Sequence, residues 1–163
     1  DSVATQLNHS YCNNDNTPQQ NWARCDWFSR MSSRASADFM PSMAVIARQD
    51  PAQQWALTDA QLENLGITEH QRWMAFHFVM GYEKMPAEVY DQREQQYISE
   101  KSLYGTGKIR VGKDTVARQH ACLIPWEELD ALSRRENAIT GGNVDYKQSD
   151  KNNVLAIAQL YVS

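Results

Sequence analysis

The sequence lacks any apolar run long enough to span a membrane, and its 163 residues do not open with a signal-peptide pattern. It also lacks an excess of positive charge, since 16 Lys and Arg stand against 20 Asp and Glu, a net charge of −4. A general nucleic-acid binder usually carries a basic surface. We therefore expect neither nucleic acid nor membrane among the partners of this protein.

Cysteine is scarce as well, with only Cys12, Cys25 and Cys122. An odd number of widely spaced cysteines fits reduced thiols in a cytoplasm better than a disulfide framework, so we expect a cytoplasmic protein. His9 lies close enough in sequence to Cys12 and Cys25 to suggest zinc ligands. A fourth ligand at matching spacing is missing, and the sequence predicts neither a metal nor a cofactor.

The composition that remains is that of an ordinary globular chain, with 42% hydrophobic and 22% charged residues. Its length suits one domain with a substantial core. Because the first residue is Asp1 rather than Met, we expect a segment of a longer protein or a processed chain. Residues 1–21 are polar and are expected to form a loose N-terminal lead-in, with one domain over residues 22–163.

Capping patterns predict mainly α structure. Thr58 precedes Gln61 by three residues, and Thr68 precedes Gln71 in the same way, so each pair predicts a helix start. Gly66 and Gly81 are suited to closing these two helices. Ser133 with Glu136 is a further capping box, and residues 104–113 predict a loop or short hairpin. The expected helices lie near 32–48 (around Pro41, which either kinks it or begins its second half), 59–65, 69–80, 87–102 and 145–160.

The segment EHQRWMAFHFVMGY (69–82) places His70, Trp73 and His77 on one helix face. Phe76, Val79 and Met80 occupy a different face, which we expect to be the core side. Packed, hydrogen-bonded core residues are the ordinary explanation for such a His–Trp face. The alternative is a ligand-binding face, on which the neighbouring carboxylate Glu69 orients the His70 ring and favours its protonated form.

Four segments together resemble the ryanodine-receptor (RyR) domain, in the form found in bacteria beside Rossmann-type (TrkA-N) domains of potassium-channel regulators. EHQRWMAFHFVMGY is similar to its E-H-x-x-W signature, and HACLIPWEEL to its H-P-x-L-V-P-[YW]-x-x-L segment. YKQSDKNNVLAI resembles the K-x-x-D-R ending, and SSRASADFMP resembles a stretch that precedes the domain. The resemblance covers about residues 22–161.

The resemblance implies a single compact helical domain with short irregular or hairpin segments. It also implies a module that binds and relays rather than one that turns over a substrate, with a Rossmann-type domain as a partner in the same parent chain. The sequence departs from the family at Ser33, at Cys122 and at Lys151, which replaces an arginine able to make bidentate contacts. These departures bear on the identity of the ligand more than on the fold.

Three functions remain open. The first is a non-catalytic, ligand-sensing or regulatory module for a nucleotide-like anionic molecule, which needs a stacking plane and positive charge. The second is a protein-interaction or scaffold module without a small ligand. The third is a hydrolytic enzyme using His70 and Glu69, or His120, although nucleophile-elbow, phosphate-loop and metal motifs are missing. The residues expected to share a ligand pocket are Arg34, His70, Trp73, His77, Trp126, Lys147 and Lys151.

Overall fold

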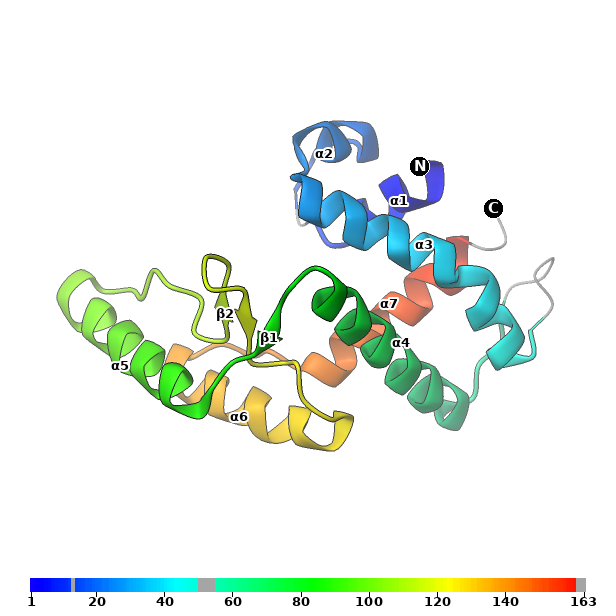
Figure 1. Ribbon diagram of the computed structural model, residues 1–163. Coiled ribbons are helices and arrows are strands. Elements are labelled where there is room, and N and C mark those ends of the chain that lie inside the picture. The colour runs from blue at the N-terminus through cyan, green and yellow to red at the C-terminus, as the bar shows by residue number, and fades with distance from the viewer. Residues whose placement is uncertain (13, 50–54, 161–163) are drawn as a thin grey trace. The chain divides into compact units, whose positions relative to one another are not determined.

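A computed structural model describes residues 1–12, 14–49 and 55–160 (Figure 1). Its helices and strands follow in chain order: α1 (Ser2–Ser10), α2 (Pro18–Arg24), α3 (Trp27–Ala47), α4 (Asp59–Val79), β1 (Glu83–Lys84), α5 (Ala87–Tyr104), β2 (Lys113–Asp114), β3 (Gln119–His120), the short 3₁₀ helix η1 (Trp126–Glu128), α6 (Leu129–Thr140) and α7 (Tyr146–Leu160). Helix dominates and the strands are only two residues long, which confirms the mainly α class.

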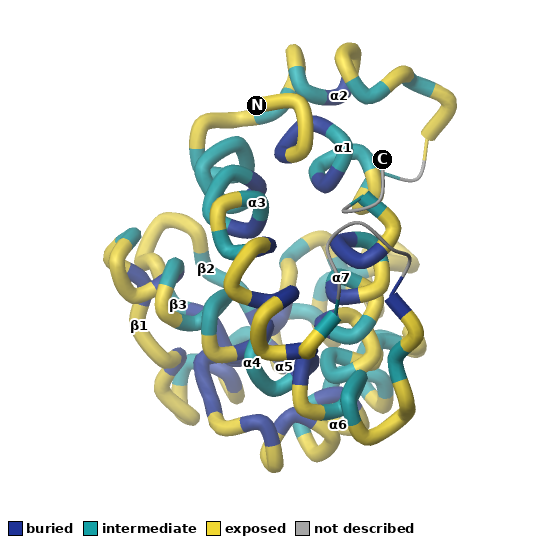
Figure 2. The backbone as a smooth tube through the Cα atoms, turned by 90° about the vertical axis from the view of Figure 1, so that its right-hand side faces the viewer, coloured by how far each residue is buried: buried dark blue, intermediate teal, exposed yellow. Residues whose placement is uncertain are grey.

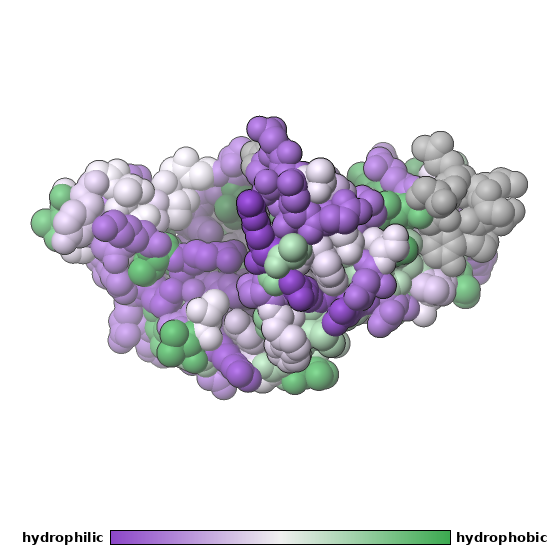
Figure 3. Space-filling model, turned by 90° about the horizontal axis from the view of Figure 1, so that it is seen from above, coloured by the Kyte–Doolittle hydropathy of each residue, from purple (hydrophilic) through white to green (hydrophobic). Residues whose placement is uncertain are grey.

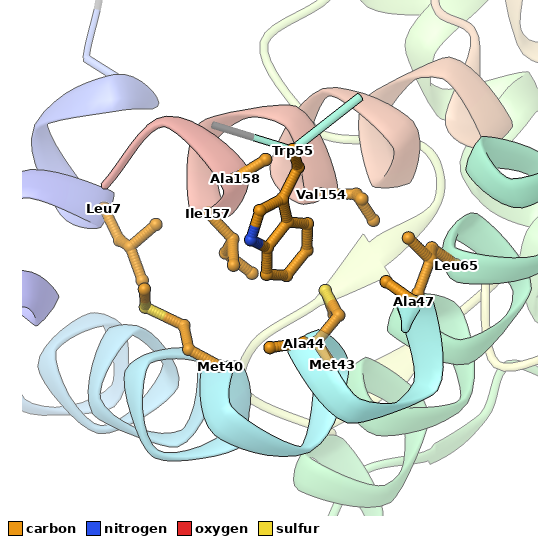
Figure 4. Packing of buried hydrophobic residues seen from close by; sticks show 10 residues of the cluster. All are labelled: Leu7, Met40, Met43, Ala44, Ala47, Trp55, Leu65, Val154, Ile157 and Ala158. Carbon is orange, nitrogen blue, oxygen red and sulfur yellow. The ribbon is translucent and has the colours of Figure 1, made fainter. Parts of the chain in front are cut away.

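Contacts divide the chain into two units, which are described separately. The first unit comprises residues 1–76 and 149–163, and the second comprises residues 77–148. The core of the first unit is an apolar cluster supplied by several helices (Figure 4). Leu7 comes from α1, Met43 from α3, Leu65 from α4 and Ile157 from α7, and all four are almost fully buried. Buried and exposed residues alternate along these helices, as expected where one face packs and the other meets solvent (Figure 2).

The N-terminal segment is helical, so the expected loose lead-in over residues 1–21 is wrong. Leu7 of α1 belongs to the apolar core of the first unit. Helix α2 begins with a capping box, in which Thr17 and Gln20 exchange hydrogen bonds, and with Pro18 in its first turn. Polar composition hid these helices, because Leu7 is one of few apolar anchors in this stretch.

Helix α4 is one helix of 21 residues, where the sequence predicted two. The capping box at Thr58 and Gln61 is confirmed, with hydrogen bonds in both directions. The second predicted box is wrong, since the Thr68 hydroxyl donates to the Asn64 carbonyl inside the helix. Gly66 is buried within α4 rather than closing a helix. Packing here outweighs the roughly 1 kcal/mol by which glycine disfavours a helix interior.

The other predicted helices are confirmed near their expected positions. Helix α3 begins at an Asp26 cap, earlier than predicted, and runs through Pro41 without interruption. Gly81, as expected, takes a left-handed conformation (φ +80°) just after α4. The capping box predicted at Ser133 is wrong, because Ser133 lies inside α6 and its hydroxyl accepts a hydrogen bond from the Tyr146 amide.

The second unit contains a small sheet with the strand order β1-β3-β2. Strand β1 pairs with β3 in parallel, and β2 pairs with β3 antiparallel. The hairpin therefore joins residues 113–114 to 119–120, and most of the 104–113 segment is a loop. A second apolar cluster lies here, formed by Met85, Tyr90, Val111 and Ala121.

The surface seen from above is mainly hydrophilic, with hydrophobic residues in small separate groups (Figure 3). Across the part of the chain that the structure describes, no helix has both the length and the apolar character required for a membrane span.

The single α4 helix can be tested with two threonine substitutions. Thr58→Ala removes a helix cap and should lower the free energy of unfolding by about 1 kcal/mol. Thr68→Ala should change it by less than about 0.5 kcal/mol, because Thr68 lies mid-helix, where alanine is the better helix former. Urea denaturation of both variants measures the difference. Equal losses would contradict a continuous helix.

Candidate functional site

The part of α4 that was singled out from sequence, residues 69–79, contains a buried ion pair between Glu69 and Arg72. Arg72 donates from Nε to Glu69 Oε2 at 2.8 Å and from Nη2 to Oε1 at 2.7 Å. The two residues are three apart, so they are neighbours on the helix surface and the guanidinium can grip the carboxylate with two bonds. Glu69 is 0% exposed, and the Arg72 side chain is 9% exposed.

Beside this pair, Asp150 of α7 holds the ring of His70. His70 Nδ1 lies 3.0 Å from Asp150 Oδ2, and both residues are buried. The ring is held by Asp150, whereas each oxygen of Glu69, which we expected to orient the ring, accepts a hydrogen bond from Arg72. His70 also stacks on Trp73 in α4, with ring centroids 5.9 Å apart and planes inclined by 13°. Trp73 is more than half buried.

The phenol of Tyr11, just after α1, lies close enough to this cluster for the charges of the cluster to shift its pKa. Burial raises the pKa of Tyr11, and the charge of Glu69 adds to the effect. The residue as a whole is 56% exposed, so it marks the solvent side of the cluster. We call Tyr11, Glu69, His70, Arg72 and Asp150 the signature network.

Burial also sets the protonation chemistry of the two carboxylates. It raises the pKa of Glu69, against the opposing effect of Arg72, and it raises the pKa of Asp150, against the opposing effect of His70. With both carboxylates ionised, Arg72 balances one negative charge and a protonated His70 would balance the other. The network is therefore electrically neutral either when the imidazole carries its second proton or when one of the two carboxyl groups is protonated.

One donor of the network remains unused. Arg72 Nη1 is buried and has no hydrogen-bond partner among the described residues. A buried donor without an acceptor costs roughly 1–3 kcal/mol, more when it is charged. The network thus lacks one acceptor oxygen at this position.

The burial pattern of α4 reverses one expectation. Val79, expected on the core side, is 85% exposed, while His70 and His77 are buried. Phe76 and Met80 are only partly buried. Hydrophobicity alone gave the wrong face, because partners distant in sequence, such as Asp150, make burial of a polar side chain tolerable.

His77 begins the second unit, where its ring meets Tyr82 and His120. The His77 ring centroid lies 5.2 Å from that of Tyr82 and 5.5 Å from that of His120, both edge-on. His120 Nδ1 accepts a hydrogen bond from the Cys122 amide at 3.1 Å. The proton of a neutral His120 ring is therefore on Nε2.

Trp126 and Lys147 come together in the second unit. Lys147 Nζ lies 5.4 Å from the centroid of the Trp126 ring and 2.8 Å from Asp130 Oδ2. Trp126 is only 6% exposed. The sequence predicted a stacking plane with a nearby free cation. The structure instead gives a buried ring covered by a lysine that is already paired.

The remaining predicted cations lie in the first unit and are also paired. Arg34 makes two 2.7 Å bonds to Asp1, from Nε and from Nη2. Its guanidinium also lies over Trp22 and borders a half-open hollow of about 440 Å³ lined by residues 1–4, 34, 37 and 38. Lys151 pairs with Glu63 at 2.5 Å.

The structure thus joins the predicted residues in small sets. His70 meets Trp73, Trp126 meets Lys147, and Arg34 and Lys151 each meet a separate carboxylate. Sequence reasoning missed Arg72 and Tyr11. The E-x-x-R spacing of Glu69 and Arg72 on a predicted helix was a signal for the first, whereas Tyr11 carried none.

The glycine-rich 104–113 segment has its own internal anion. Glu100 Oε2 accepts hydrogen bonds from the Lys108 and Ile109 amides at 2.6 and 3.3 Å. A carboxylate of the chain therefore takes the backbone donors that a phosphate would need. Within the described ranges, no group of three or more His, Cys, Asp or Glu side chains is arranged to hold a metal ion.

Comparison with known proteins identifies no relative: no family model, curated protein or solved structure matches the chain.

The raised pKa of Asp150 predicts a pH-dependent stability. A carboxyl group with a raised pKa stabilises the fold fully below its unfolded pKa, near 3.8, and this contribution is lost as pH rises through the folded pKa. The free energy of unfolding of the wild type should therefore fall relative to that of Asp150→Asn as pH rises from about 4 towards 7. Urea denaturation across this range measures it, with the exposed Asp15→Asn as control. Parallel curves for wild type and Asp150→Asn would contradict the assignment.

The burial of Trp126 predicts a core role. Trp126→Ala should lower the free energy of unfolding by about 3–5 kcal/mol. Trp27, which is 66% exposed, is the matched control, and its replacement by Ala should cost less than about 1 kcal/mol. Denaturant midpoints compare the two variants. A small loss at Trp126 would show that its ring is not part of the core.

Proposed function

We propose that the chain is a non-catalytic sensing module that binds a small anionic ligand at the Arg72 end of the signature network. The observation that carries this proposal is the buried Nη1 of Arg72, which has no hydrogen-bond partner in the part of the chain that the structure describes. Its other two donating nitrogens are held by Glu69, so the guanidinium is fixed in orientation. A ligand oxygen at Nη1 would gain a charge-assisted hydrogen bond from a preorganised donor.

Tyr11 gives this site an approach from solvent. Tyr11 is 56% exposed as a whole residue and lies near the buried charges, so the network is close to solvent on this side. Trp73, stacked on His70, adds aromatic surface in the same unit. An aromatic surface beside a guanidinium suits a nucleotide, which offers a flat base and phosphate oxygens.

The resemblance to the RyR domain supports a module that binds and relays. It places Glu69, His70, Trp73 and Asp150 at signature positions, and Arg72 lies between them. The partner that would receive the signal is a Rossmann-type domain of the same parent chain. A bacterial, cytoplasmic setting belongs to the same proposal.

The charge of the network limits the affinity. Two carboxylates surround Arg72, so an anionic ligand must offset their repulsion, and protonation of His70 would help it do so. One charge-assisted hydrogen bond and one aromatic contact, after the costs of association, imply a dissociation constant of roughly micromolar to millimolar.

Calorimetry with ATP, ADP and cyclic dinucleotides tests this function. The wild type should bind at least one of them, and Arg72→Lys, which keeps the charge but loses Nη1, should bind at least about 10-fold more weakly, one hydrogen bond's worth of free energy. Arg134→Ala, at an exposed arginine of the second unit, is the control and should bind like the wild type. Circular dichroism checks that each variant is folded.

Two results would overturn the proposal. One is an absence of heat for every nucleotide at millimolar concentration. The other is equal binding by the wild type and a folded Arg72→Lys.

A second candidate is a protein-interaction module without a small ligand. It is favoured by exposed apolar side chains of the second unit, where Val79 is 85% and Val116 is 94% exposed. The hydrogen bond from Arg118 to the Met80 carbonyl brings the loop that carries Val116 next to the end of α4. Failure of every nucleotide in calorimetry would leave this candidate as the better one.

A further inference from the structure

Two cysteines of the first unit lie against the same residue, Asn8 of α1. The Cys12 thiol donates to the Asn8 carbonyl, with 3.4 Å between Sγ and O. The Asn8 side-chain amide donates to Cys25 Sγ at 3.2 Å. Asn8 therefore connects the two sulfurs, although they are 13 residues apart in sequence.

Both thiols lie near the C-terminal end of α1, where Asn8 contacts each of them. Cys12 follows Asn8 by four residues in a chain that continues to turn, since the Cys12 amide donates to the His9 carbonyl at 2.9 Å. Side chains four residues apart on such a turn have Cβ atoms roughly 5–6 Å apart. The Asn8 side chain, which reaches Cys25, thus lies beside the Cys12 side chain.

The two thiols differ from the third in their access to solvent. Cys12 and Cys25 are partly exposed, whereas Cys122 is buried. Cys25 stands at the end of α2, as its C-cap residue. Burial raises the pKa of the Cys25 thiol, and the neighbouring charge of Asp26 raises it further, so Cys25 is mainly protonated near neutral pH.

We propose that Cys12 and Cys25 are a redox-active pair that forms an intramolecular disulfide by exchange with a low-molecular-weight disulfide such as oxidised glutathione. The Cys12 thiolate attacks one sulfur of glutathione disulfide, forming a mixed disulfide and releasing one glutathione thiolate. The Cys25 thiolate then attacks the Cys12 sulfur and releases the second glutathione. The two thiol protons pass to the two glutathiones, so the protein is oxidised by two electrons and glutathione disulfide is reduced.

This order of attack follows from the surroundings of each sulfur. Cys25, whose pKa is raised by burial, is mainly in its thiol form, and it acts second, when the mixed disulfide on Cys12 is already held beside it through Asn8. The product links the end of α1 to the end of α2. Since the link restricts the unfolded chain, the oxidised protein should unfold at a higher temperature than the reduced protein.

Mass spectrometry of the reduced chain after incubation with oxidised glutathione tests this pair. After the incubation, the remaining free thiols are blocked by alkylation. The protein is then digested and its peptides are sequenced. The wild type and Cys122→Ser should both lose two hydrogens and yield a peptide crosslinked between Cys12 and Cys25. Cys25→Ser should stop at the mixed disulfide, with glutathione retained on Cys12. The crosslink should form faster as pH rises, because its second step needs the Cys25 thiolate.

Two results would overturn the proposal. The first is a wild type that carries glutathione but no intramolecular crosslink at any pH at which it is folded. The second is a crosslink that includes Cys122 and is lost in Cys122→Ser. Neither readout depends on ligand binding, so the disulfide proposal is tested separately from the sensing function.

Discussion

The pairing of Glu69 with Arg72 is the interaction on which the first unit depends. A fully buried carboxylate without a partner would destabilise a fold by several kcal/mol, and the two hydrogen bonds from Arg72 make its burial tolerable. Asp150 and His70 extend the network from α4 to α7, beside an apolar core to which the same helices contribute Leu65 and Ile157. Polar and apolar contacts therefore fix these helices together.

A network of this kind is an expensive way to stabilise a fold, because apolar residues of similar size often do as well. Its presence at the resemblance positions is the reason to connect it with function. Arg72 Nη1 gives that connection a chemical form, because it is a donor for which the described residues supply no acceptor. The cations singled out from sequence, Arg34, Lys147 and Lys151, have carboxylate partners and are weaker candidates for a ligand.

Local signals predicted much of the fold. The capping box at Thr58, the positive φ of Gly81, and the extents of α5 and α7 were all readable, since caps and glycine conformations depend on a few neighbouring residues. The same signals failed at Thr68 and Gly66. They predicted a helix start at Thr68 and a helix end at Gly66, but the helix continues through both residues. Tertiary packing decides there, because burying one long helix outweighs a single unfavourable residue.

The sequence by itself determined the mainly α class, most helix positions, and the placement of His70 and Trp73 on a common helix face. Only the tertiary structure decided which face of α4 is buried and which partner each charge takes. Helical spacing places residues on a common face, but it cannot say which face is inside once the polar one has distant partners. Asp150 and Tyr11 reach α4 from 80 and 58 positions away, measured to His70 and Glu69, and only the folded chain brings them there.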